Sequence, residues 1–296
     1  MVSLSALSLL VEVAPRAGAD AHIATPVALA CHGSLLGAPL NKPIVGIAAT
    51  PDQGGYWLLG ADGGVFSFGD AQFYGSTGNL TLNKPVVGMA TTPDGKGYWF
   101  VAADGGVFNY GDAQFYGSTG NQTLNKRVVG MAATPDGKGY WLVASDGGIF
   151  AFGDAGFYGS TGSLVLNQPV VAMAATAAGN GYWLAAADGG IFSFGTTMFF
   201  GSGPQVVEGV TDFNSFAAST DGGGYIMANA SRGYLLNFGD ARYGGIGFNP
   251  ADTSLLAGLT QPVATANYSY WDTTQVGGVS LNDPGAHPGA ATTTAC

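Results

Sequence analysis

Residues 128–155 read VVGMAATPDGKGYWLVASDGGIFAFGDA, and variants of this stretch return along the chain. Trp57, Trp99, Trp141 and Trp183 each lie 42 residues from the next one. The copy at 85–126 and the copy at 127–168 agree at about 30 of 42 positions, more than a shared composition would produce. The chain is therefore built from duplicated units of about 42 residues.

The repeats cover nearly the whole chain, and no linker divides it. Because Cys31-His32-Gly33-Ser34 falls in phase with Phe73-Tyr74-Gly75-Ser76, the segment 1–42 is interpreted as a degenerate first copy. Well-formed copies follow at 43–84, 85–126, 127–168 and 169–211, then a divergent copy at 212–254 and a worn last copy with a tail at 255–296. The pattern predicts a single domain of seven units, with six as the alternative.

Each unit contains short apolar segments separated by turn residues. Asp104-Gly105 favours a tight hairpin turn, and Pro93-Asp94-Gly95 is a second turn signal. Residues between such turns suit a pleated sheet because they are aromatic or branched. Four short antiparallel strands are thus expected in each copy, and in the copy at 85–126 they fall near 86–92, 98–102, 107–110 and 114–118.

The expected strands are apolar on both faces, as in Tyr98 to Ala102, so both faces of each small sheet must be covered. Neighbouring sheets stacked around a central axis supply that cover. The sequence therefore predicts an all-β fold, a β-propeller of seven four-stranded blades of about 42 residues. A β-solenoid is the alternative architecture.

The layout from Val128 to Ala155 also resembles the propeller repeats of secreted actinobacterial proteins, which often stand beside cell-wall hydrolase domains. The arrangement of the blade is similar to RCC1-type repeats. The likeness covers residues 43–245 well and the two ends poorly. It implies the fold and a secreted or cell-surface location, but no activity, because propellers carry many unrelated functions.

Charge excludes some partners. Nine Lys+Arg against 19 Asp+Glu give a formal net charge of −10, which repels phosphate backbones, so no nucleic acid is expected. Gly, Asp and Pro interrupt every apolar run before it reaches the roughly 20 residues of a membrane-spanning helix, so no membrane insertion is expected. The start of the chain, with apolar Leu4 to Val11, fits either a signal peptide or the first repeat. Cys31 and Cys296 would join the two ends if they pair.

Residues for catalysis are scarce. The three histidines, His22, His32 and His287, lie outside the good repeats, and Glu12 and Glu208 are the only glutamates. A histidine triad, an imidazole metal site or a glycosidase carboxylate pair is therefore not expected, and neither is a cofactor. The aspartates that recur before Gly-Gly or after an aromatic-Gly pair suit turns, where their side chains accept backbone N–H groups. A cation role for them lacks the calcium-loop pattern.

Repeated aromatic residues are the candidate ligand-binding groups. Aromatic faces suit the C–H faces of sugar rings, and Tyr hydroxyls supply orienting hydrogen bonds. Phe-Tyr pairs recur beside them at 73–74, 115–116 and 157–158. The alternative role for these aromatics is packing between blades. The predicted ligand-binding residues are Tyr56, Trp57, Tyr74, Tyr98, Trp99, Tyr116, Tyr140, Trp141, Tyr158, Tyr182 and Trp183.

These features together favour a secreted, monomeric and non-catalytic binding module that recognises extracellular or cell-wall glycans through pockets between blades. Several equivalent pockets would raise avidity without raising the affinity of any one. A protein-protein interaction scaffold is the first alternative, because the copies after Gly201 diverge and make seven equal pockets doubtful. A glycan-acting enzyme is the second.

Overall fold

A computed structural model describes residues 32–35, 37–207, 209–219, 221–229, 234–241, 256–259, 270–274, 279–283 and 292–295. The described residues form β-strands joined by turns and loops, together with one 3-10 turn, η1, at Gly203–Gln205. The all-β prediction is confirmed. The strands are β1 Ile44–Ala49, β2 Gly55–Gly60, β3 Val65–Gly69, β4 Val86–Thr91, β5 Gly97–Ala102, β6 Val107–Gly111, β7 Val128–Ala133, β8 Gly139–Ala144, β9 Ile149–Gly153, β10 Val170–Ala175, β11 Gly181–Ala186, β12 Ile191–Gly195, β13 Phe213–Ala218, β14 Gly224–Asn229, β15 Tyr234–Gly239, β16 Leu256–Leu259, β17 Tyr270–Thr274, β18 Val279–Asp283 and β19 Thr292–Ala295.

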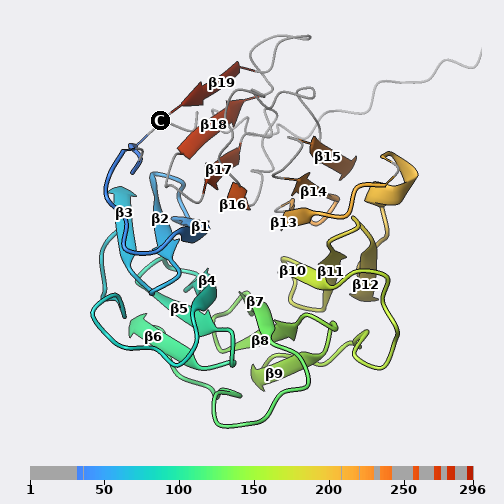
Figure 1. The fold of residues 1–296 in the computed structure, drawn as a ribbon, viewed down its shortest axis with the longest axis horizontal. Coiled ribbons are helices and arrows are strands. Elements are labelled where there is room, and N and C mark those ends of the chain that lie inside the picture. The colour runs from blue at the N-terminus through green and yellow to red at the C-terminus, as the bar shows by residue number, and fades with distance from the viewer. Residues whose placement is uncertain are drawn as a thin grey trace, which may run out of the picture.

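The strands make small antiparallel sheets, one for each sequence copy from 43 onward. Five sheets have three strands each, from β1-β2-β3 to β13-β14-β15, and the sheet β16-β17-β18-β19 has four. The sheets stand around a common axis, with the first strand of each innermost (Figure 1). Each innermost strand contacts the innermost strands of the sheets on either side, and β16 contacts β1, so the ring is closed.

The described residues hold six sheets, one fewer than the seven predicted. The described part of the first copy contains no strand and corresponds to the loop that ends a copy. The Tyr56 hydroxyl donates to the backbone oxygen of Gly33, as the Tyr98 hydroxyl donates to that of Gly75. Residues 1–31 and Cys296 lie outside the described residues, as do the predictions made for the signal-like start and for the cysteine pair.

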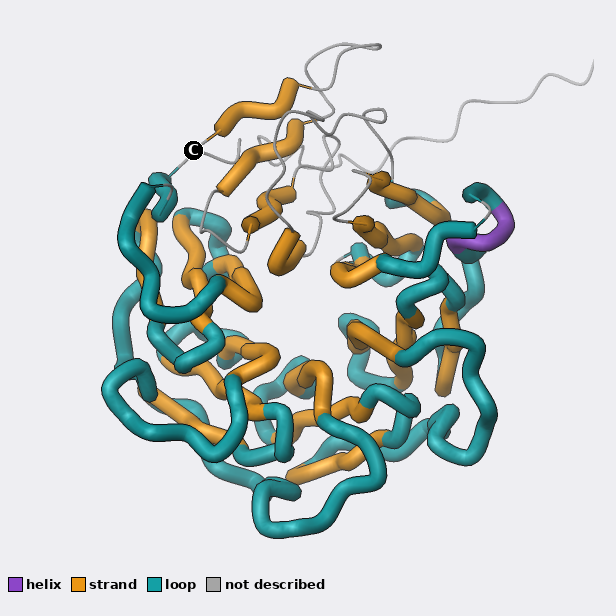
Figure 2. The backbone as a smooth tube through the Cα atoms, viewed as in Figure 1, coloured by secondary structure: helices purple, strands orange, loops and turns teal. Residues whose placement is uncertain are grey.

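The predicted fourth strand of each well-formed copy is wrong. Residues 114–118 are loop rather than strand, and the same holds for the equivalent segments of the three other well-formed copies. These segments form part of the outer connections drawn as loops (Figure 2). The backbone amides of these segments form hydrogen bonds with the next sheet. For example, the amides of Tyr116 and Gly117 donate to the Tyr140 hydroxyl, at 3.2 and 3.1 Å. Hydrogen bonds to a buried side chain therefore replace those of a strand ladder.

The turn between the second and third strands needs glycine. Gly105 has φ of +79°, a left-handed conformation that side chains rarely adopt. A Cβ added there would also collide with the side chain of Thr119, which belongs to the loop that follows the sheet. Asp104 completes the turn by accepting the Gly106 amide at 3.0 Å. The Asp-Gly-Gly motif therefore fixes both the hairpin and its contact with the outer loop.

The hydrophobic core lies between neighbouring sheets, and similar contacts recur at successive interfaces. The middle strands β2, β5, β8, β11 and β14 are buried over their whole length. Trp57 packs edge-on against Tyr98 of the next sheet, with ring centroids 5.8 Å apart. Trp183 of β11 and Tyr225 of β14 make the same contact, with ring centroids 6.0 Å apart. No helix among the described residues is long and apolar enough to cross a membrane.

Candidate functional site

The Tyr-Trp pairs of the middle strands are not accessible to a ligand. All eight side chains are at most 1% exposed, because each strand has a sheet neighbour on both faces. The prediction that they line binding pockets is therefore wrong, and the packing alternative describes them. The eight are Tyr56, Trp57, Tyr98, Trp99, Tyr140, Trp141, Tyr182 and Trp183.

The polar atoms of these buried aromatics are used inside the protein. The Tyr98 hydroxyl accepts the Tyr74 amide at 2.9 Å and the Gly75 amide at 3.1 Å, and donates to the Gly75 carbonyl at 2.8 Å. The Trp99 indole N–H donates to the Gln114 carbonyl at 2.6 Å. Burial raises the pKa of Tyr98, and it raises the pKa of Tyr56 to about 12. These hydroxyls therefore stay protonated and hold the outer loops to the sheets.

The second group of predicted residues, Tyr74, Tyr116 and Tyr158, lies nearer the surface. Each hydroxyl donates to a backbone carbonyl in the first turn of the next sheet: Gly95 at 3.1 Å, Gly137 at 3.0 Å and Gly179 at 2.8 Å. Tyr158 is 36% exposed and the other two are half-buried. These tyrosines tie neighbouring sheets together, and only part of each ring is open to a ligand.

An exposed phenylalanine precedes each of these outer tyrosines. Phe115 is 56% exposed and Phe157 is 63% exposed, although Phe is among the residues most often buried in proteins. A fourth copy adds Phe199, which is followed by Phe200 instead of Tyr. The four residues, which we call the rim phenylalanines, are Phe73, Phe115, Phe157 and Phe199. Their 42-residue spacing is visible in the sequence. Only the structure shows that they are more exposed than the residues that follow them.

The repeated aspartates act within turns. Asp62, Asp104, Asp146 and Asp188 each accept the amide of the glycine two residues on, at 3.0 Å. Among the described residues no three His, Cys, Asp or Glu side chains gather as metal ligands. The acceptor oxygens therefore stabilise the hairpins, which is the role that the sequence favoured for them.

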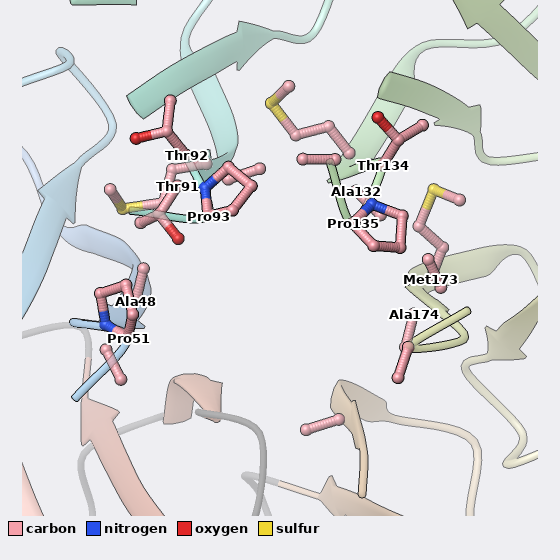
Figure 3. A pocket seen from close by; sticks show the side chains of 18 of the residues that line it. Ala48, Pro51, Thr91, Thr92, Pro93, Ala132, Thr134, Pro135, Met173 and Ala174 are labelled. Carbon is pink, nitrogen blue, oxygen red and sulfur yellow. The ribbon is translucent and has the colours of Figure 1, made fainter. Parts of the chain in front are cut away.

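A cavity of about 500 Å³ lies on the ring axis. It is lined by the second half of each inner strand from β1 to β10, by part of β13 and by the turns that follow these strands, so equivalent residues recur around its wall. Proline rings, methionine side chains and alanine methyl groups face one another across the space (Figure 3). Its described lining contains no Asp, Glu, Lys, Arg or His. Such a wall can enclose a ligand but offers no group for acid–base chemistry.

Comparison with known proteins supports the fold. Neither a family model nor a curated protein sequence matches the chain. Among solved structures, the chain is similar to the β-propeller domain of Cps50 (Swd1) from Myceliophteria thermophila, with a TM-score of 0.54 over 89% of each chain. The two sequences are only 8% identical, so the likeness establishes the fold alone. The chain is a β-propeller.

Proposed function

We propose that this β-propeller is a secreted or cell-surface, monomeric binding module, without catalytic activity, that recognises glycans through its rim phenylalanines. The observation that carries the proposal is a phenylalanine retained at an exposed position in four copies. The residue directly before it varies, and in three of the four copies it is exposed as Gln72, Gln114 or Met198. Random drift between duplicated copies would not be expected to spare an exposed aromatic residue while it changes the residue directly before it.

The chemistry of the rim suits carbohydrate. A phenyl ring that is more than half exposed presents a face to the C–H groups of a sugar. Asp112 and Gln114 are exposed close to Phe115 in the sequence and supply carboxylate and amide groups for sugar hydroxyls. One exposed ring offers little contact area, so binding would depend on several copies acting at once, and a polymeric glycan with repeated units would gain most.

The test is retention on insoluble peptidoglycan and on a glycan array. We expect Phe115→Ala to weaken binding about threefold to tenfold, and replacement of all four rim phenylalanines by Ala to abolish it, because avidity multiplies the losses. Leu80→Ala is the matched control, since Leu80 is 56% exposed but is not a rim phenylalanine. Equal binding by the fourfold variant and the Leu80→Ala control would overturn the proposal.

A protein-binding scaffold is the second candidate function, favoured by an uneven distribution of exposed apolar side chains. Leu164 and Val165 in one copy, and Met198 in the next, are all more than half exposed, whereas the copy at 85–126 has only Phe115 in this class. A protein partner would use one side of the ring. Loss of binding to a protein partner in Val165→Asp, with the Phe115→Ala variant unaffected, would favour this function.

A further inference from the structure

The cavity wall has very few hydrogen-bonding side chains to spare. The hydroxyls that follow the inner strands are engaged in the turn: Thr92 Oγ1 accepts the Gly97 amide at 2.9 Å and donates to Asp94 at 3.0 Å. Thr50, Thr134, Thr176 and Ser219 make equivalent bonds within their own turns. They therefore turn mainly carbon atoms towards the cavity.

Gln53 is the first lining residue that departs from the repeat. It has φ of +62° and is the only non-glycine residue with positive φ among the described residues. The equivalent residues in the other three-stranded sheets are glycines with φ of +68° to +74°, namely Gly95, Gly137, Gly179 and Gly222. A left-handed conformation costs a side chain about 1–2 kcal/mol. The chain thus keeps an amide-bearing residue in the cavity lining at an energetic cost that glycine would avoid.

The neighbouring turns show why glycine is needed elsewhere. A Cβ on Gly95 would lie 2.7 Å from the Pro51 ring of the preceding sheet, and Gly137 has the same relation to Pro93. Gln53 holds the equivalent position in the first three-stranded sheet, whose neighbour on that side is the sheet β16-β17-β18-β19. The Gln53 side-chain amide has no hydrogen-bond partner within the described part of the chain, so both its donor and its acceptor are available.

Thr91 is the second departure. It is the last residue of its inner strand, where the copies on either side have Ala49 and Ala133. Its side chain lies on the cavity wall beside Pro93 (Figure 3). The described residues give the Thr91 hydroxyl no hydrogen-bond partner. Gln53 and Thr91 belong to neighbouring sheets, so the two polar groups without a partner come from adjacent parts of the described wall.

We propose that the central cavity binds a neutral small molecule with an apolar body and one hydrogen-bonding group, which the Gln53 amide and the Thr91 hydroxyl hold. A volume of about 500 Å³ suits such a molecule. The side chains of Met89, Met131 and Met173 can adapt to the shape of an apolar body because they are flexible and polarisable. A charged ligand would lose its hydration without gaining an opposite charge from the described wall.

The experiment uses two fluorescent probes with the same aromatic body. N-phenyl-1-naphthylamine is neutral and carries one N–H group, whereas 8-anilino-1-naphthalenesulfonate adds a sulfonate. We expect the neutral probe to bind saturably and the sulfonate probe to bind at least tenfold more weakly. Gln53→Gly and Thr91→Val should each weaken binding of the neutral probe about threefold to tenfold. The proposal is independent of the rim, so the fourfold rim variant should bind this probe like the native protein.

Gln53→Gly is informative because we expect it to stabilise the fold while it weakens binding of the probe. Replacing a left-handed glutamine by glycine should raise Tm while affinity for the neutral probe falls, so weaker binding could not come from unfolding. Gln72→Gly is the control, since Gln72 is exposed outside the cavity and the equivalent residue in another copy is Gly156. Native affinity for the neutral probe in both Gln53→Gly and Thr91→Val, or equal affinity for the two probes, would overturn the proposal.

Discussion

The turn between the first and second strands differs between the sheet β4-β5-β6 and the sheet β1-β2-β3 in the charged side chains that surround it. In the former, Lys96 pairs with Asp94, with Nζ and Oδ2 3.1 Å apart. In the latter, glycine replaces the lysine, and the Asp70 carboxylate occupies the position that a Cβ on Gly54 would take. Asp70 there accepts the Thr50 hydroxyl at 3.2 Å. The residue before the second strand therefore decides where the carboxylate after the third strand lies.

The two arrangements recur in other sheets, which makes the comparison more than a single case. Lys138 and Asp136 repeat the lysine arrangement, with Nζ and Oδ2 again 3.1 Å apart. Gly223 and Asp240 repeat the glycine arrangement, because the Asp240 carboxylate fills the place of a Cβ on Gly223. The same turn backbone therefore accommodates either an ion pair or two neighbouring carboxylates. We expect this difference in charge to change the free energy of unfolding.

The largest effect should come from the buried threonine that both arrangements share. Thr92→Val leaves the buried Gly97 amide without its acceptor, and we expect a loss of about 1–3 kcal/mol in the free energy of unfolding. Thr50→Val should cost more, because Thr50 also donates to a carboxylate that has no lysine beside it. Urea unfolding of both variants measures the difference. Equal losses would show that the hydrogen bond from Thr50 to Asp70 contributes no more than the hydrogen bond from Thr92 to Asp94.

Gly54→Lys should convert the glycine arrangement into the lysine one. The new Cβ would displace the Asp70 carboxylate, and the lysine would then lie beside Asp52 as Lys96 lies beside Asp94. We expect a gain of about 0.5–1 kcal/mol, mostly from the reduced freedom of the unfolded chain. The gain is measured by thermal unfolding, with Gly54→Ala as the control that lacks the ammonium group. Destabilisation by Gly54→Lys would mean that this turn cannot adopt the lysine arrangement.

Much of this architecture could be predicted from the sequence because the repeats are close copies. The period of the tryptophans placed the sheets, and the Asp-Gly-Gly pattern placed the turns between second and third strands. Residues 114–118 failed as a strand because their aromatic composition suits a sheet, whereas their hydrogen bonds go to the Tyr140 hydroxyl of the next sheet. Local pattern carries no information about such long-range partners.

The candidate site was harder to predict, for a related reason. A sequence shows that Phe115 and Tyr116 recur together, but not that the tyrosine hydroxyl is engaged by Gly137 while the phenyl ring faces solvent. Gln53 carried a signal that comparison of the copies could have found, since four other copies have glycine at its position. Its meaning depends on φ and on the cavity, and both come from the structure.

The smallest expected effects concern how the free energy of unfolding depends on pH, which should differ between the glycine and the lysine arrangements. Burial, and then the charge of Asp221, raises the pKa of Asp240, so the fold favours its protonated form. The stability it contributes is therefore present at low pH and is lost as pH rises through its raised pKa. We expect Asp240→Asn to stabilise the protein at pH 7, by less than about 0.5 kcal/mol because the pair is largely solvated, and to have no effect at pH 3. Urea unfolding at the two pH values measures this.

The lysine arrangement should respond to acid in the opposite direction. Hydrogen bonds from the backbone and side chain of Lys96 lower the pKa of Asp94 to about 2, and Lys138 does the same for Asp136. Their contribution is present above the unfolded value of 3.8 and is lost as pH falls towards 2. In the double variant Asp94→Asn/Asp136→Asn, stability should therefore fall less steeply between pH 4 and pH 2 than in the native protein. An identical slope would show that these exposed ion pairs are too well solvated to affect folding, and that the two arrangements differ only in geometry.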